Sequence, residues 1–392
     1  MEILSIIFYL LLPIAIFASG VLFDIFIKNK KTSKIIQIVF ISLLVAMVIG
    51  FRSVTVGNDT SSYFYSYEHM REIPLDEALN TAHFEKGYLI ITFIFSNMRM
   101  PFFLFNFIVA LLLSSFLTLS CYLLSKYPSL SVAIYVCAGC FTLNMSSVRQ
   151  TLAMALCFAS IFLLTTLKNK NYLIKAVCLI PWALAIFIHK SSALFIIAFA
   201  CMFIRPKKIY SVIYFALASL LIILFMPSLS TQILFSNIKA TETYSFFPPR
   251  AILSFSGTAL MLYVIVVLFH VFYTEKTFLF DFSLSKIKFL NKLNGIIKIN
   301  ESEYFNDRIV VGMVYFQYLM YLGEQSVSLL ARAGLYGGMG LCIFIPNLVN
   351  KISKEEKTNP VFLFGILLFF VAYFAFTTLK DNYLGLVPYG VF

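Results

Sequence analysis

Charged residues are scarce in this chain: they make up 12% of its 392 residues, whereas hydrophobic residues make up 60%. A chain of that composition would aggregate in water, which excludes an ordinary soluble domain and favours a protein with several membrane spans. The hydrophobic runs also lack alternating polar and apolar residues, which excludes the strands of a transmembrane barrel. The first run, Ile3–Phe23, lacks a basic leading segment and a small-x-small cleavage site, so we interpret it as a spanning helix and not as a cleavable signal peptide.

Metal-binding motifs are missing as well. Cys137 and Cys140 form one CxxC pair, but a zinc site needs a second pair or added histidines, and neither is nearby. We therefore interpret the two cysteines as small residues of a helix. No DxD or other paired-acid motif lies near the arginines discussed below, so we expect no metal and no other cofactor.

The net charge of +12 comes from basic residues that gather between the hydrophobic runs. Basic loops stay on the cytoplasmic side of a membrane, so we place these loops inside and expect no nucleic-acid partner. The five basic groups are Lys28, Lys30, Lys31 and Lys34; Lys168, Lys170 and Lys175; Arg205, Lys207 and Lys208; Lys286 to Lys298; and Lys351, Lys354 and Lys357.

This charge pattern predicts a single integral membrane domain, residues 1–392, with about a dozen transmembrane helices and external termini. If Phe84–Met98 crossed the bilayer, Lys168–Lys175 would lie outside, so we interpret Phe84–Met98 as a re-entrant or interfacial helix within an external loop, residues 52–101. Full spans are expected at Ile3–Phe23, Ile35–Phe51, Phe102–Leu124, Leu130–Met145, Val148–Leu167, Tyr172–Ile188, Ala193–Ile204, Val212–Phe225, Ala251–Phe272, Ile309–Leu322, Leu329–Ile345 and Val361–Thr378.

A second long loop, residues 274–308, is expected in the cytoplasm. Within it, Leu284–Ile297 repeats apolar residues at helical spacing, with Lys286, Lys288 and Lys292 between them. A basic amphipathic helix of this kind lies on an anionic lipid surface. Docking to a cytoplasmic partner is the alternative.

Polar chemistry gathers at the predicted outer face, first in the segment from Arg52 through Asp59 and Thr60 to Tyr63. Gly57 and the residue after it signal a turn. Asp59 or Thr60 is suited to cap the following helix, and in the plainest interpretation Arg52 only reaches from a helix end towards water. A capping carboxylate can still face a substrate.

Two further segments place cations at the starts of helices. Ser146 or Ser147 is expected to cap a helix whose first turn carries Arg149 and Gln150. An arginine there is unfavourable for the helix itself, so we expect an anion opposite it: either a phosphate, or an external carboxylate in a salt bridge.

The next segment is His189-Lys190, followed by Ser191 and Ser192 as expected caps of another helix. His189 is a candidate general base, proton shuttle or hydrogen-bond donor to phosphate. A histidine that is merely solvated at the membrane surface is the alternative.

The last polar segment carries Arg332, one turn before Tyr336 on the same predicted helix face. Glu324 lies upstream and is able to neutralise Arg332. Arg250 opens another helix from the outside, and Glu85 precedes the non-spanning segment at the rim.

Together these residues predict a cationic cleft with acid and base groups at its edge. Such a cleft suits a lipid-linked diphosphate, whose negative charge grows as its ester bond to carbon breaks. A carboxylate or the histidine would take the proton of an attacking hydroxyl, and the residues leave open which group does so. The candidate catalytic residues are Asp59, Glu85, Arg149, His189 and Arg332, and the candidate substrate-binding residues are Arg52, Thr60, Tyr63, Gln150, Lys190, Arg250 and Tyr336.

In this order the segments resemble the EpsG family of Wzy-type polysaccharide polymerases. The matching residues are Arg52 with Gly57, Asp59, Thr60 and Tyr63; Arg149-Gln150; His189-Lys190-Ser191; Arg332 with Tyr336; and the closing Val387-Pro388-Tyr389. The resemblance covers nearly the whole chain. It does not account for Asn58 inside the first segment or for the basic segment Thr274–Arg308.

The resemblance implies a bacterial cytoplasmic-membrane enzyme of O-antigen, capsule or exopolysaccharide biosynthesis. Its fold would be similar to GT-C-like glycosyltransferases that need no metal. Donor and acceptor would both be oligosaccharides linked to undecaprenyl diphosphate, and the other expected partners are membrane lipids, a chain-length regulator and a flippase.

Two other classes remain open from the residues. A lipid-linked oligosaccharide flippase or other transporter also has about a dozen spans, but transporters commonly show internal repeats, and none is visible here. A non-enzymatic assembly or sensor subunit would use the loop Arg52–Gly87 as a docking surface.

Overall fold

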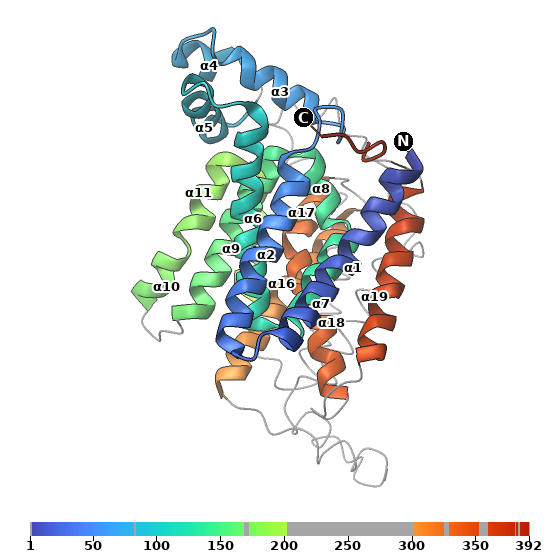
Figure 1. Cartoon of the computed structure of the whole chain (residues 1–392). Coiled ribbons are helices and arrows are strands. Elements are labelled where there is room, and N and C mark those ends of the chain that lie inside the picture. Colours follow the sequence, from blue (N-terminus) through green and yellow to red (C-terminus); the bar gives the residue numbers. More distant parts are fainter. Residues whose placement is uncertain are drawn as a thin grey trace, which may run out of the picture. The chain divides into compact units, whose positions relative to one another are not determined.

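Every regular element of the protein is a helix in the part of the chain described by the computed structural model, which is residues 2–81, 84–167, 172–201, 301–324, 329–352, 360–380, 382 and 385–391 (Figure 1). The α-helices are α1 (Glu2–Phe26), α2 (Lys30–Gly50), α3 (Thr60–His69), α4 (Leu75–Thr81), α5 (Lys86–Asn97), α6 (Phe102–Leu124), α7 (Pro128–Cys137), α8 (Cys140–Ser146), α9 (Val148–Leu167), α10 (Tyr172–Cys178), α11 (Ile180–Ile188), α12 (Ile196–Cys201), α16 (Glu301–Glu324), α17 (Leu329–Gly334), α18 (Gly338–Ile352) and α19 (Pro360–Phe374). Two 3-10 helices, η1 (Lys190–Phe195) and η3 (Leu335–Gly337), and a π-helix, η4 (Ala375–Leu379), complete the set.

These helices form two compact units, which are described separately. The first unit comprises Met1–Ala193, Ile345–Asn347 and Thr358–Phe392, and the second comprises Leu194–Phe344 and Leu348–Lys357. The first unit therefore contains α1 to α11 and α19, and the second contains α12, α16, α17 and most of α18.

Six helical stretches are long and apolar enough to cross a membrane in the described residues, or seven if the pair α7 and α8, bent by 59° at its break, forms one span. The expected all-α membrane fold is confirmed, whereas the expected dozen spans is not. Leu173–Ile188 and Lys190–Ala200 are apolar but shorter than a span. The predicted spans Val212–Phe225 and Ala251–Phe272 lie outside the described residues, as does the predicted amphipathic stretch at 284–297. The six stretches are Glu2–Phe26, Lys30–Gly50, Phe102–Leu124, Val148–Leu167, Arg332–Asn350 and Val361–Leu379.

The first unit is built on helices that pack side by side, α2 on α6, α6 on α9 and α9 on α11, with α1 against α7. The hydroxyl of Ser114 on α6 donates to the carbonyl oxygen of Ser42 on α2 at 2.8 Å, and small polar side chains of this kind join helices inside membranes. Large apolar side chains such as Leu4 and Leu11 remain exposed on the outer faces, as expected for surfaces that contact lipid.

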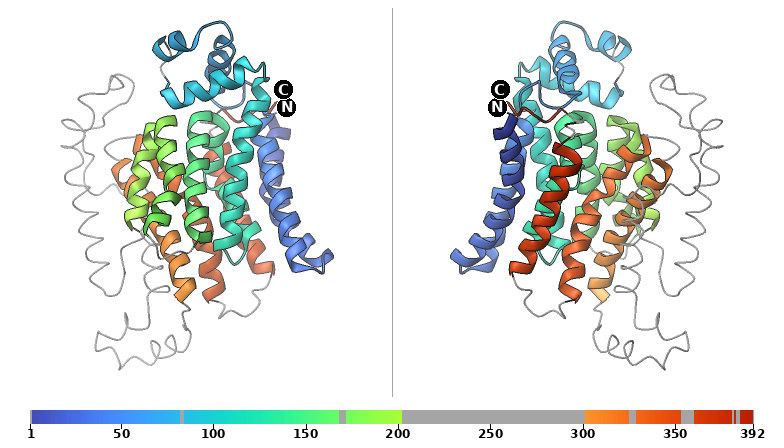
Figure 2. Two further views of the ribbon diagram at one scale, coloured as in Figure 1. Left: turned by 90° about the vertical axis from the view of Figure 1, so that its left-hand side faces the viewer. Right: turned by 90° about the vertical axis from the view of Figure 1, so that its right-hand side faces the viewer.

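A layer of shorter helices, α3 to α5, lies across one end of the first unit (Figures 1 and 2). Helix α5 has 12 residues, which corresponds to roughly 18 Å and is too short to cross a hydrocarbon core of ~30 Å. Tyr67 fastens the layer: its ring stacks on Phe105 of α6 at 5.2 Å, and its hydroxyl donates to the Met100 carbonyl at 2.9 Å.

The C-terminal segment is fastened to the same end of the first unit, where Figure 1 also shows the N-terminus. Backbone N–H groups of Ser53 and Gly57 donate to the carbonyls of Gly390 and Gly385 at 2.7 and 2.8 Å. The Tyr389 hydroxyl donates to the carbonyl oxygen of Val48 at the end of α2, at 3.0 Å. The C-terminal segment thus holds both the end of α2 and the loop that follows it.

In the second unit, α16 packs against α12, α17 and η3. The ring of Phe195 contacts Phe316 of α16 and Tyr336 of η3, with centroids at 5.4 and 6.2 Å. Tyr336 is fully buried and Arg332 is exposed, and the α-helix ends between them at Gly334 and continues as a 3-10 turn. A shared helix face of Arg332 and Tyr336 stays a prediction.

Candidate active site

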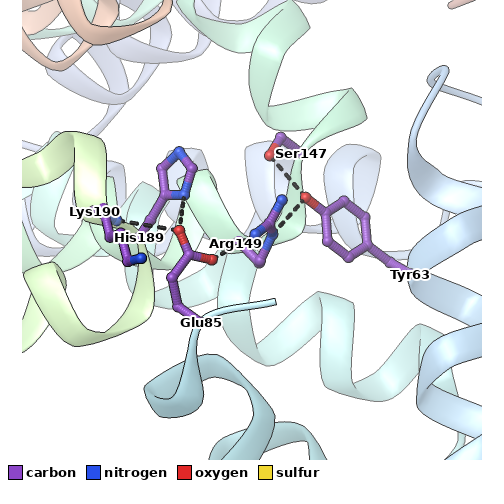
Figure 3. Close-up of polar contacts among 6 residues, drawn as sticks. All are labelled: Tyr63, Glu85, Ser147, Arg149, His189 and Lys190. Atoms are coloured by element: carbon purple, nitrogen blue, oxygen red, sulfur yellow. Dashed lines mark hydrogen bonds and ion pairs between the residues drawn. The ribbon is translucent and has the colours of Figure 1, made fainter. Parts of the chain in front are cut away.

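Glu85 is the centre of a polar cluster in the first unit (Figure 3). Its Oε2 pairs with Nη1 of Arg149 at 2.5 Å, and its Oε1 lies 3.0 Å from Nδ1 of His189. The backbone N–H of Lys190 donates to the same Oε1 at 3.2 Å. One carboxylate therefore holds a guanidinium, an imidazole and a backbone amide together.

In the sequence, Glu85 is 64 positions from Arg149 and 104 positions from His189. The three residues can meet because each lies at the end of a helix. Arg149 is in the first turn of α9, His189 directly follows α11, and Glu85 directly precedes α5. Gly87 makes the approach possible: a Cβ there would lie 2.5 Å from the carbonyl oxygen of Phe187 in the last turn of α11. Only a glycine lets α5 come this close to α11.

Burial strengthens the electrostatics of the cluster. The exposed fractions of the Glu85, Arg149 and His189 side chains are 13%, 20% and 19%. Burial alone would raise the pKa of Glu85, but the hydrogen bond from His189 and the charge of Arg149 lower that pKa to about 2. The carboxylate is therefore ionised at neutral pH.

An ionised carboxylate only accepts hydrogen bonds, so Nδ1 of His189 must carry the proton in their contact. The other ring nitrogen, Nε2, is then unprotonated in the neutral imidazole. It has no hydrogen-bond partner in the described part of the chain. This arrangement presents a base whose orientation is fixed by Glu85.

Arg149 is held on its other side by aromatic residues. Its Nε donates to the hydroxyl of Tyr63 at 3.0 Å, and that hydroxyl also lies 3.2 Å from Oγ of Ser147. The guanidinium carbon lies 4.4 Å from the ring centroid of Phe84, within the range of a cation–π contact. The predicted alternative for Arg149 was a salt bridge to an external acid, and the structure contains an ion pair with Glu85 of the predicted external loop.

Arg52 does not reach towards water, which corrects that interpretation. It is 1% exposed, and its guanidinium donates to the carbonyl oxygen of Ile49 and to Oγ1 of Thr60. Burial lowers the pKa of Arg52 to about 10, so it remains protonated at neutral pH. No carboxylate pairs with it among the described residues. The phenols within electrostatic range of Arg52 are those of Tyr9, Tyr389, Tyr88 and Tyr63.

The expected serine and aspartate caps are only partly present. Asp59 occupies the N-cap position of α3, but its side chain makes no capping hydrogen bond. Its backbone N–H instead donates to Oγ of Ser146 at 3.3 Å, while the Ser147 hydroxyl contacts Tyr63. The hydroxyls of Ser146 and Ser147, which the sequence predicted to cap α9, therefore take part in tertiary contacts with other segments. The Ser192 hydroxyl, also an expected cap, is buried without a partner among the described residues.

Tight packing around Gly57 places this loop against the end of α8. The backbone φ of Gly57 is +87°, and a Cβ there would overlap the carbonyl oxygen of Met145. The Thr60 hydroxyl donates to the carbonyl of Val56 at 2.7 Å. Gln150, next to Arg149, is 1% exposed. The structure thus brings the first three predicted segments to one end of the first unit.

The remaining predicted site residues are not part of this cluster as described. Arg332 and Tyr336 belong to the second unit, and a role for them at the site stays a prediction. Arg250 lies outside the described residues. Phe84, Tyr9 and Tyr88 were missed by the sequence reasoning, since an isolated aromatic residue carries no signal beyond packing.

In the described residues, no group of three or more histidine, cysteine, aspartate or glutamate side chains is arranged to hold a metal ion. What the cluster offers is an oriented base beside a guanidinium. Such a pair can accept a proton while stabilising negative charge nearby.

Comparison with known proteins adds the family. No curated protein and no solved structure matches the chain. The model of the EpsG family matches residues 35–391, which is nearly the whole chain. Members of this family are Wzy-type polysaccharide polymerases, so the resemblance seen in the sequence is confirmed and a membrane glycosyltransferase is supported. This multi-pass membrane protein belongs to the EpsG family.

Proposed function

We propose that this protein joins oligosaccharide repeat units carried on undecaprenyl diphosphate at the outer face of the bacterial cytoplasmic membrane. The growing chain is transferred from its lipid diphosphate to a hydroxyl of the next lipid-linked unit. One observation carries the proposal: Glu85 holds the base His189 and the cation Arg149 together at one end of the first unit. Transfer from a diphosphate to a hydroxyl needs both kinds of group.

His189 acts as the general base. The acceptor hydroxyl oxygen forms a bond to the anomeric carbon of the donor, and its proton passes to Nε2 of His189. Glu85 accepts the hydrogen bond from Nδ1 and stabilises the imidazolium that forms. General bases of this kind contribute roughly 10²–10⁴-fold to a rate.

Arg149 stabilises the leaving group. As the bond between the anomeric carbon and the phosphate oxygen breaks, the electron pair stays with the diphosphate, whose charge increases. A guanidinium binds phosphate through two parallel N–H donors, so Arg149 exchanges its contact with Glu85 for one with phosphate. In this proposal the arginine takes the part that a divalent ion plays in other diphosphate chemistry.

Reconstitution of the purified protein tests this function. The protein is incubated with an undecaprenyl-diphosphate-linked repeat unit of the organism in the presence of a metal chelator, and polymer is scored as a ladder on a gel. We expect a ladder from the wild type, and a decrease of at least about 10²-fold for Arg149→Ala and for His189→Gln.

His69→Gln serves as the matched control, since His69 is exposed and contacts only Glu72 on the surface. It should polymerise like the wild type. A folded wild-type protein that yields no ladder refutes the polymerase proposal and favours a flippase. A ladder that persists in His189→Gln refutes the role of His189 alone.

A further inference from the structure

Two further hydrogen-bond donors, on residues that contact helix α3, take no part in the proposed chemistry. Nε of Arg52 and the hydroxyl of Tyr88 are both buried and have no hydrogen-bond partner among the described residues. The two side chains are each 1% exposed. A buried donor left without an acceptor costs free energy, so two of them in one region suggest that an acceptor belongs there.

The residues that carry these two donors are linked to Arg149 through helix α3. The rings of Tyr88 and Tyr63 meet edge to face with centroids 5.7 Å apart, and the Tyr63 hydroxyl accepts from Nε of Arg149. Arg52 reaches the same helix, α3, through its contact with Thr60, one turn before Tyr63. Burial raises the pKa of the Tyr88 hydroxyl, and the charges of Arg149 and Arg52 act against that increase, so both guanidinium groups lie within electrostatic range of the phenol.

The charge of this region is positive. Arg149 is neutralised by Glu85, whereas Arg52 has no carboxylate partner in the described part of the chain. A buried cation without a counter-charge favours an anionic ligand. Two guanidinium groups within electrostatic range of one phenol match a ligand with two linked anionic groups better than one with a single group.

We propose that Nε of Arg52 and the hydroxyl of Tyr88 form an inner anion subsite, which takes one phosphate of a diphosphate group while Arg149 takes the other. This inference rests on the proposed function, since the diphosphate is the one that links the donor sugar to its lipid. Tyr63 covers the subsite: its ring stands against Tyr88, and its hydroxyl is held by Arg149. A diphosphate that draws Arg149 away from Tyr63 also releases the cover.

Tyr88→Phe tests the subsite, because it removes only the unpartnered hydroxyl. Tyr67→Phe is the matched control: Tyr67 is a buried tyrosine of the same helical layer, and its hydroxyl already donates to Met100. Thermal unfolding of the full-length protein in detergent is followed while inorganic diphosphate, and separately orthophosphate, is titrated.

The wild type should be stabilised at lower concentrations of diphosphate than of orthophosphate. Tyr88→Phe should raise the half-saturating diphosphate concentration about tenfold or more, since a hydrogen bond to a charged group is lost. Without ligand, the unfolding temperature of Tyr88→Phe should equal or exceed that of the wild type. Tyr67→Phe should unfold at a lower temperature than the wild type but bind diphosphate as the wild type does.

The subsite is refuted if Tyr88→Phe binds diphosphate as tightly as the wild type, if the wild type is not stabilised by diphosphate, or if Tyr67→Phe weakens binding equally. The polymer ladder separates this from the proposed function. If the wild type forms a ladder and Tyr88→Phe binds diphosphate as the wild type does, the subsite alone is refuted. If the wild type forms no ladder but diphosphate binding depends on Tyr88, the polymerase function is refuted and the subsite is retained.

Discussion

Replacing Glu85 by glutamine should destabilise the protein in a way that depends on pH. The pKa of Glu85 falls from 4.5 to about 2 in the folded state, because the hydrogen bond from His189 and the charge of Arg149 outweigh the effect of burial. Each tenfold change in proton affinity corresponds to about 1.4 kcal/mol, so ionisation of Glu85 stabilises the folded state by about 3 kcal/mol. This figure lies at the lower end of the cost of breaking a buried ion pair.

The stabilising effect of the Glu85 charge decreases as pH falls. Because the pKa is lower in the folded state, the stabilisation is fully present above the unfolded pKa of 4.5 and is lost as pH falls through about 2. Wild type and Glu85→Gln should therefore differ most at pH 7, less at pH 3.5, and little at pH 2. At neutral pH we expect the variant to unfold roughly 5 °C lower.

Thermal unfolding in detergent at these pH values measures the difference. Glu68→Gln is the control, because Glu68 forms an ion pair with Arg71 that is about one-third exposed on both sides. An exposed pair of this kind contributes under about 1 kcal/mol. A Glu85→Gln deficit that is the same at every pH, or a Glu68→Gln deficit of equal size, would show that the charge of Glu85 is not what stabilises the cluster. Polymer formation by Glu85→Gln should fall roughly 10²–10⁴-fold, since a neutral amide stabilises imidazolium poorly.

Two further substitutions test the geometry of the cluster. Arg149→Lys keeps the charge but loses the planar donor pair, so polymer formation should fall at least about tenfold in the gel assay while the ion pair with Glu85 keeps most of the stability. Gly87→Ala places a methyl group against the carbonyl of Phe187 and should separate α5 from α11, with loss of polymer and a lower unfolding temperature. Gly365→Ala, where a Cβ meets no atom within 4 Å, should leave both measurements nearly unchanged, and a comparable loss there would refute the packing argument.

Much of the helical framework could be predicted from hydrophobic runs and helix-breaking residues. The predicted bounds of α6 and α9 agree with those observed, because Pro101 precedes one run and Ser147 separates two others. The bend between α7 and α8 was not predicted. Gly139, with φ +81°, lies at that bend, and a single glycine in an apolar run is too weak a signal to separate a kink from tight packing.

The gathering of the first three polar segments at one end of the first unit was also predictable, since it follows from which helix end each segment occupies. The partner of each polar side chain could not be predicted. Glu85 and Asp59 are both acids of the predicted external loop, residues 52–101, and nothing local distinguishes them. Glu85 meets His189 because Gly87 packs on Phe187, a contact between residues that are 100 positions apart in the numbering. Partner choice of this kind is decided by tertiary packing, which a single sequence does not display.

For the proposed function, the shared carboxylate gives one site a way to hold an anion and then do base chemistry. Before substrate binds, Glu85 neutralises Arg149 and keeps the buried guanidinium from standing alone. In the proposed reaction, a diphosphate takes over Arg149, and the whole negative charge of Glu85 then becomes available to His189, at the step where the imidazole gains a proton. Binding the leaving group and strengthening the base are then the same event, because both depend on a single acid held between two partners.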